Sequence, residues 1–226
     1  MVAASEGPEA EKREAMNRLL GAYWYPLYAH VRRRGYSAET AHDLTQAFLE
    51  RMLERQWLGR ADANRGRFRA FLLASLDHFL ANERVGRRTL KRGGKVHFVS
   101  LPMDEAELRW RRDSSRDLTP ERAYDLHWVL NLLEAVLRRI RAELASNGRE
   151  REFELLKPYL TGGNPPRYAE LTVALSLTEA AARMAVYRLR QRYRLLVREE
   201  IARTLADPGL VEDELQSLLT VLRTAT

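Results

Sequence analysis

The chain has 226 residues, a formal net charge of +7 and no cysteine, and all of its basic residues except Lys12, Lys91, Lys95 and Lys157 are arginine. Its length suffices for one large or two small domains, the lack of cysteine excludes disulfides and thiolate metal sites, and the basic balance suits a partner that carries phosphates. The first twenty residues hold four glutamates and no apolar run, and no later stretch is apolar over a membrane-spanning length, so we expect a soluble cytoplasmic protein with no membrane insertion.

The first predicted helix runs from about Glu9 to Arg34. It contains Pro26, which should bend or divide it, because proline has no backbone N–H to donate. The aromatic residues around this proline, positions 23 to 28, lie among leucines. They could stack on bases, but packing in a core is the better interpretation.

A second helix is predicted from Ser37, as its cap, to about Arg55. Its apolar stripe should face the core, and its other face is polar. Asp43 and Gln46 lie three residues apart on that polar face and therefore point the same way. Plain solubility is the simplest explanation of such a pair, and contact with another protein is the alternative.

Residues 57–66 have the composition of a polar loop, and apolar residues then recur at helical spacing from Phe68 to Leu80. This helix leads into a basic run between Arg84 and Lys95 that contains no acid. A solvated charge run is one interpretation. Because the run continues a buried helix and lacks compensating carboxylates, we favour a surface for nucleic acid.

Residues 95–118 mix acids and arginines and are predicted to be an interdomain linker. Thr119 and Pro120 begin a long amphipathic helix that Asn147-Gly148 should end, and a further helix is expected over residues 149–160. A terminal amphipathic helix follows Asp207-Pro208-Gly209. It should either pack back on the protein or meet a partner, and the sequence leaves that choice open.

The stretch from Tyr168 to Arg194 has the pattern of a helix-turn-helix. Thr178 can cap its second helix, in which Ala182, Val186, Leu189 and Tyr193 follow the helical period inward. The outward row of the same helix is basic and partly aromatic, and consists of Glu179, Arg183, Tyr187, Arg190 and Arg194. Such a face suits the DNA major groove, although helical hairpins with arginine on the wet side also occur without any role in DNA binding.

The elements together predict an all-α protein of two helical domains joined by a linker, the second with a helix-turn-helix. We divide it into residues 1–94, 95–118, 119–206 and a C-terminal extension at 207–226. Three segments stand in a characteristic order: Ala41-His42-Asp43-Leu44-Thr45-Gln46-Ala47-Phe48, Gly66-Arg67-Phe68-Arg69-Ala70-Phe71-Leu72 and Tyr168-Ala169-Glu170-Leu171. On these segments the chain resembles, over roughly residues 15–205, sigma-70-family RNA polymerase sigma factors of the extracytoplasmic-function type.

The resemblance implies a function and its sites. Core RNA polymerase would bind Asp43 and Gln46, and the acids of the linker would mimic nucleic-acid charge. Promoter DNA would bind at two sites on the protein, which would be associated with the bacterial nucleoid. The expected contacts to the minus-35 element are Thr178, Arg183, Tyr187, Arg188, Arg190 and Arg194. Those to the opened minus-10 element are His78, Asn82, Arg84, Arg87, Arg88 and Lys91. An anti-sigma factor is a further partner that the family allows, and no catalytic residue, cofactor or metal is expected.

The chain departs from the family pattern at several positions. Ser176 replaces the usual turn glycine, Ala182 the usual valine and Phe71 the usual tryptophan, while His42 and Asn82 stand where acids are common. Two other classes stay open. A stand-alone helix-turn-helix regulator would normally dimerise, whereas an enzyme is disfavoured, because the five histidines are scattered and Lys91-Arg92-Gly93-Gly94-Lys95 lacks the spacing of a phosphate-binding loop.

Overall fold

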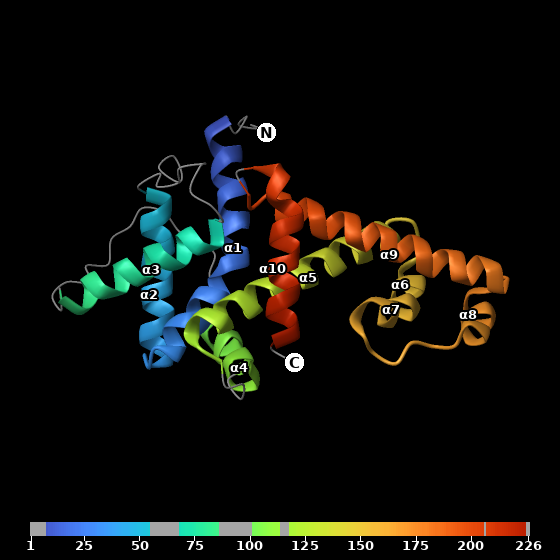
Figure 1. Ribbon diagram of the computed structural model, residues 1–226, viewed down its shortest axis with the longest axis horizontal. Coiled ribbons are helices and arrows are strands. Elements are labelled where there is room, and N and C mark those ends of the chain that lie inside the picture. The colour runs from blue at the N-terminus through green and yellow to red at the C-terminus, as the bar shows by residue number, and fades with distance from the viewer. Residues whose placement is uncertain (1–7, 55–67, 86–100, 114–117, 206, 225–226) are drawn as a thin grey trace, which may run out of the picture. The chain divides into compact units, whose positions relative to one another are not determined.

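The computed structural model describes residues 8–54, 68–85, 101–113, 118–205 and 207–224. Every regular element in these ranges is a helix, which confirms the all-α prediction (Figure 1). The chain separates into two compact units. Unit 1 comprises Met1–Leu130 with Thr204–Thr226, and unit 2 comprises Asn131–Arg203.

Helices α1 (Pro8–Arg33) and α2 (Ala38–Glu54) lie side by side in unit 1. Helix α1 is not divided, because it runs through Pro26 to Arg33. The aromatic residues near this proline are core residues, as predicted: Tyr23 and Tyr28 are fully buried, and Trp24 stacks on Tyr28 with ring centroids 5.3 Å apart. The first helix therefore contributes much of the core of unit 1.

Helix α3 (Phe68–Val85) begins where the sequence predicted it and buries Leu72, Leu76 and Leu80. The buried apolar face fixes the helix on unit 1, and His78 and Asn82, near its C-terminal end, are exposed. The predicted loop at residues 57–66 and the basic run after Val85 lie outside the described residues.

Helix α4 (Met103–Asp113) occupies part of the stretch that the sequence suggested was a linker. It packs against α1: the Tyr28 hydroxyl donates a 2.8 Å hydrogen bond to Glu107, Arg32 donates to the same carboxylate at 3.1 Å, and the Tyr25 hydroxyl donates to Asp113 at 3.0 Å. Burial, and then the Glu107 carboxylate, raise the pKa of Tyr28 to about 12. Two of the acids expected to mimic nucleic acid thus bind residues of the protein itself.

A 3₁₀ turn at Pro208–Leu210 leads into the terminal helix α10 (Val211–Thr224), which belongs to unit 1. Its Glu214 is only 1% exposed and accepts a 2.6 Å hydrogen bond from Nε of Arg69 on α3, itself 5% exposed. Arg69 also donates to Asp125. The terminal helix therefore packs back on the protein, which is one of the two alternatives that the sequence left open.

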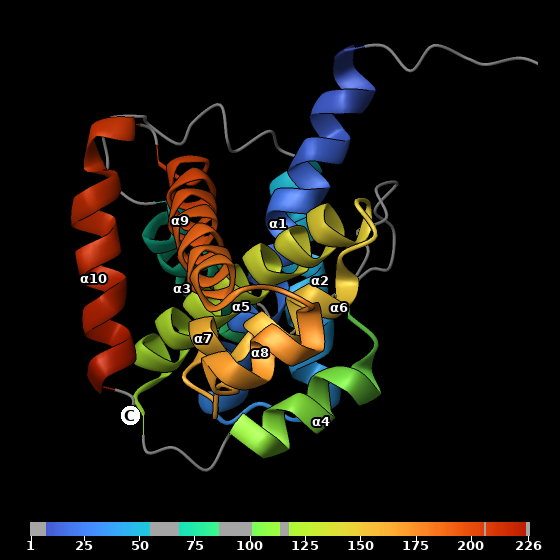
Figure 2. The same cartoon turned by 90° about the vertical axis from the view of Figure 1, so that its right-hand side faces the viewer.

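Helix α5 (Pro120–Ala145) contributes residues to both units, so the division falls after Leu130 rather than before Thr119 as expected. The other helices of unit 2 are α6 (Glu150–Leu156), α7 (Pro158–Thr161), α8 (Tyr168–Leu175) and α9 (Glu179–Ala202). The single helix predicted over 149–160 is interrupted, because Pro158 cannot continue the hydrogen-bond ladder. Figure 2 views unit 2 from the end where α8 lies against α9.

Candidate nucleic-acid interface

The turn between α8 and α9 is set by three consecutive residues. Ser176 adopts the left-handed conformation, with φ of +53°, and the N–H of Leu177 closes the end of α8 on the carbonyl of Thr172 at 3.0 Å. Thr178 then caps α9, since its hydroxyl accepts a 3.2 Å hydrogen bond from the N–H of Ala181. The predicted cap is confirmed, and the Thr178 hydroxyl is engaged in the hydrogen bond that caps α9.

Helix α9 has the two faces that its sequence predicts. Ala182, Val186 and Leu189 are buried, and burial raises the pKa of Tyr193, which is half-buried. Exposed on another face are four predicted DNA contacts: Arg183, Tyr187, Arg190 and Arg194. The helix therefore presents three guanidinium groups and one aromatic ring along a single exposed row.

Arg188, the remaining predicted contact on α9, is exposed but lies on a different flank of the helix. It lines a cavity together with Ala181, Met184 and Arg192. The structure thus groups four of the five candidates of α9 in one row and separates the fifth.

Two tyrosines, neither of them a predicted contact, lie under the arginine row. The rings of Tyr159 on α7 and Tyr168 on α8 are 5.8 Å apart, and the Tyr159 hydroxyl donates to the carbonyl of Pro166. The guanidinium of Arg183 lies 4.5 Å from the ring centre of Tyr168, and that of Arg190 lies 6.0 Å from the ring centre of Tyr159. Cation–π contact of this kind restricts where each arginine can point.

An acid accompanies the arginine row. Glu179 accepts hydrogen bonds of 2.7 and 3.1 Å from Arg183, four residues later, and these bonds raise the pKa of that arginine. A phosphate that approaches Arg183 would meet the Glu179 carboxylate beside it. Base edges are different, because the amino group of cytosine can donate to a glutamate and guanine can accept from an arginine.

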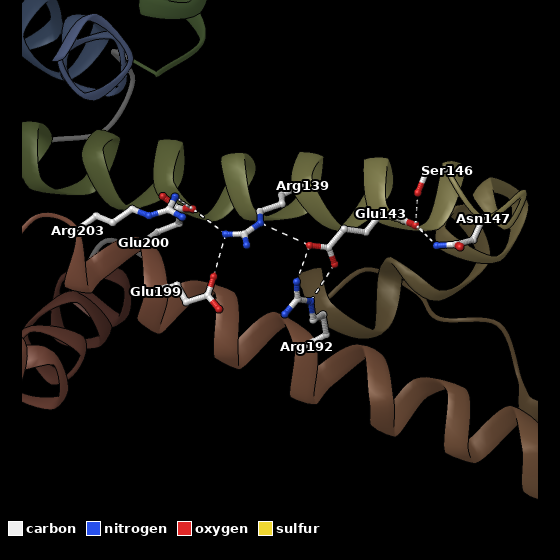
Figure 3. A network of polar contacts seen from close by, with 8 residues as sticks. All are labelled: Arg139, Glu143, Ser146, Asn147, Arg192, Glu199, Glu200 and Arg203. Atoms are coloured by element: carbon white, nitrogen blue, oxygen red, sulfur yellow. Dashed lines mark hydrogen bonds and ion pairs between the residues drawn. The ribbon is translucent and has the colours of Figure 1, made fainter. Parts of the chain in front are cut away.

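Ion pairs join α5 and α9 within unit 2 (Figure 3). Arg192 binds Glu143 through two hydrogen bonds of 2.6 and 2.8 Å, and Arg139 pairs with Glu199 at 2.9 Å and with Glu200 at 3.3 Å. The hydrogen bonds from Arg192 hold the pKa of Glu143 below its ordinary value. Because these side chains are about one-third exposed, each pair adds little stability, but together they fix the position of α9 on α5.

The candidates for the minus-10 element are only partly described. His78 and Asn82 are exposed and line a small pocket of about 50 Å³ with Arg51 and Phe79, and the Arg51 guanidinium lies 5.9 Å from the Phe79 ring centre. A pocket of this size holds only a water molecule or two, so a base would enter only after side chains move. Arg84 belongs to α3, but its side chain, like the residues Arg87, Arg88 and Lys91, lies outside what the structure describes.

The predicted polymerase contacts lie on the surface of α2. Asp43 is exposed, while Gln46 is half-buried and donates a 2.8 Å hydrogen bond to Glu50. Their neighbour His42 is directed elsewhere, since its Nε2 lies 3.3 Å from the carbonyl oxygen of Leu101 and its ring packs edge-on against Trp24. Asp43 is thus accessible to another protein, whereas the amide oxygen of Gln46 is buried and its amide nitrogen is bonded to Glu50.

Sequence reasoning missed three charged residues that organise unit 1. Arg69 appeared only inside a motif, with no role of its own. Asp125 and Glu214 carried no signal, because Arg69, the partner of both, lies 56 residues from Asp125 and 145 residues from Glu214 in the chain. In the described residues there is no group of three histidines or acids that could hold a metal ion. None of the described helices is both long and apolar enough to cross a membrane.

Comparison of the chain with protein-family models, with curated proteins and with solved structures finds no match in any of the three.

Proposed function

We propose that this protein is a DNA-binding sigma factor, which gives core RNA polymerase its promoter specificity. The observation that carries the proposal is the arginine row of α9, held on a helix that is capped by Thr178 and that meets α8 through a tight turn. A capped helix with a basic exposed face fits the major groove, where arginine forks meet phosphates and guanine edges.

The helix pair α8–α9 would act as a helix-turn-helix on the minus-35 element. Arg183 and Arg190 are the best contacts, because their tyrosine neighbours restrict them before DNA arrives and less freedom is lost on binding. Glu179 and Arg183, bonded side by side, would favour base edges over phosphates. The minus-35 element is thus read mainly through α9.

Two surfaces of unit 1 complete the proposal. His78 and Asn82, at the end of α3 beside Arg51, would hold the opened minus-10 strand, where a basic rim and aromatic rings suit unpaired bases. Asp43 and Gln46 on α2 would bind the polymerase. A formal net charge of +7 supports attraction to DNA in general.

The test is promoter-specific transcription by a reconstituted enzyme. The purified chain is added to core RNA polymerase of its native host with fragmented genomic DNA as template, and the transcripts are sequenced. A sigma factor yields defined start sites that core enzyme alone does not produce. A stand-alone regulator, the second candidate, binds DNA as a dimer and yields no start sites with core enzyme, and that result would overturn the proposal.

A further inference from the structure

Unit 2 contains a cavity of about 550 Å³ on one flank of α9. Its walls are residues of α5, α6, α9 and the turns before α6 and α9, and its apolar lining includes Ile140, Leu144, Leu156, Leu177, Met184 and Leu189. This volume lies within the usual range for sites that bind small organic molecules. An apolar surface of this extent is available to a ligand with a hydrophobic body.

The rim of the cavity is charged, and two of its arginines are already neutralised. Arg192 forms a bidentate pair with Glu143 (Figure 3), and Arg149 forms another with Glu152 through hydrogen bonds of 2.6 and 2.8 Å. The charges within each pair cancel. A charged ligand would therefore gain little electrostatic attraction from either pair.

Arg188 is different. It lines the same cavity and is exposed, and within the described residues no carboxylate or other acceptor binds its guanidinium. The rim therefore carries one positive charge more than its glutamates compensate. A guanidinium presents a planar fork of donors that matches a carboxylate or sulfonate.

We propose that this cavity binds a small amphipathic organic anion, with the apolar body on the leucine-rich lining and the anionic group at Arg188. A neutral apolar molecule would contact only the apolar lining, and a small inorganic anion would contact only Arg188. A ligand that has both an apolar body and an anionic group makes both contacts and therefore binds best. The apolar floor and the single uncompensated cation, a few residues apart on α9, select this class.

The binding test does not depend on the DNA-binding proposal. One consequence does. Arg188 is one of the DNA contacts expected from the sequence, and in that role a bound anion and the DNA would compete for one guanidinium. Occupancy of the cavity would then weaken DNA binding. Failure of that competition alone would count against the DNA role of Arg188 and would leave the cavity assignment intact.

The experiment titrates the full chain with two fluorescent probes of the same apolar body. One is the anion 8-anilinonaphthalene-1-sulfonate, and the other is neutral N-phenyl-1-naphthylamine. The variants are Arg188→Ala and its matched control Arg194→Ala, which removes an exposed arginine of the same helix that also has no acceptor within the described residues. Six residues separate the two, which places them about 120° apart around α9. Ala185→Trp, at a residue that lines the cavity, places an indole ring against the lining and reduces the space for a ligand.

We expect one saturable site for the anion in the wild-type chain, about tenfold weaker in Arg188→Ala and unchanged in Arg194→Ala. The neutral probe should not distinguish these three proteins, and Ala185→Trp should weaken both probes. Circular dichroism checks that each variant is folded. The proposal is overturned by unsaturable binding, by equal affinity in Arg188→Ala and wild type, by equal losses in both arginine variants, or by unchanged binding in a folded Ala185→Trp.

Discussion

At the scale of single residues, the arginine row of α9 differs from an ordinary solvated helix face in what surrounds it. An exposed arginine usually samples many rotamers, and fixing it costs conformational entropy. Arg183 is bonded to Glu179 and lies over Tyr168, and Arg190 lies near Tyr159. These neighbours reduce the entropy that DNA binding would otherwise consume.

Arg183→Ala and Arg190→Ala should each weaken binding of cognate upstream promoter DNA by about tenfold, because each removes a charged fork. If the lost contact was to a base, discrimination at one base pair should also relax, whereas loss of a phosphate contact should weaken all sequences alike. Fluorescence anisotropy with cognate and scrambled duplexes measures both effects. The control is Arg138→Ala, which removes an exposed arginine of α5 in the same unit. Unchanged binding in both α9 variants would show that this row is only a solvated face.

Ser176 is a second residue where local physics gives a clear expectation. It is the only non-glycine residue with positive φ in the described ranges, and a side chain in the left-handed region crowds its own backbone. Ser176→Gly should remove that strain and stabilise unit 2 by about 0.5–1 kcal/mol, after the greater flexibility of glycine in the unfolded chain is subtracted.

Urea unfolding followed by circular dichroism tests this expectation. Ser146→Gly is the matched control, because Ser146 has no positive φ and its hydroxyl donates a 3.0 Å hydrogen bond to the carbonyl of Glu143. The control should be neutral or destabilising. A Ser176→Gly protein no more stable than wild type would mean that the turn is not strained by serine.

At the scale of elements, α10 packs on unit 1 through the buried residues Leu218 and Glu214, and Glu214 forms a charged pair with Arg69. Arg69 and Glu214 are both almost fully buried, and Asp125 supplies a second carboxylate to the same guanidinium. Taking such charges out of water is costly, and only their mutual pairing offsets the cost. A variant that loses one partner leaves the other charge buried with less compensation.

Glu214→Ala should therefore destabilise the docking of α10 by roughly 3 kcal/mol, somewhat moderated by Asp125, which still binds Arg69. Hydrogen exchange of the amides of residues 211–224, followed by mass spectrometry, reports this docking directly. Asp213→Ala, at the exposed neighbouring position, should change exchange only slightly. Equal exchange in the two variants would show that the buried pair does not hold the helix.

At the scale of the whole molecule, DNA binding and polymerase binding are assigned to separate surfaces, and they should fail separately. Asp43 and Gln46 lie on α2 in unit 1, whereas the arginine row lies on α9 in unit 2. Asp43→Arg combined with Gln46→Ala should abolish retention of purified core RNA polymerase on the immobilised chain. It should leave the circular dichroism spectrum and the binding of upstream promoter DNA unchanged.

The matched control for this double variant is Glu105→Arg, which makes the same charge change at an exposed acid on α4. It should retain polymerase as the wild type does. Retention by the double variant would remove Asp43 and Gln46 from the polymerase surface. Failure of the wild-type chain to retain core enzyme would instead contradict the sigma-factor proposal as a whole.

The sequence by itself determined the helical class, most helix boundaries and the faces of α9. These features follow from local periodicity and capping, which depend on residues within about four positions of one another. The buried aromatic residues of α1, the cap at Thr178 and the exposed row from Arg183 to Arg194 were all predictable for that reason. The missing N–H of a proline did not by itself decide where helices break: the helix predicted over 149–160 is interrupted at Pro158, whereas α1 continues through Pro26.

Only the tertiary structure decided which distant residues meet. Nothing local marks Arg69 as the partner of Glu214, or Glu107 as the acceptor for Tyr28 and Arg32, because an acid or an arginine in an amphipathic helix normally faces solvent. The same holds for the tyrosines under the arginine row and for the flank of α9 on which Arg188 lies. Chain folding brought these groups together, and for the buried pair of Arg69 and Glu214 the low polarity of the interior made pairing obligatory.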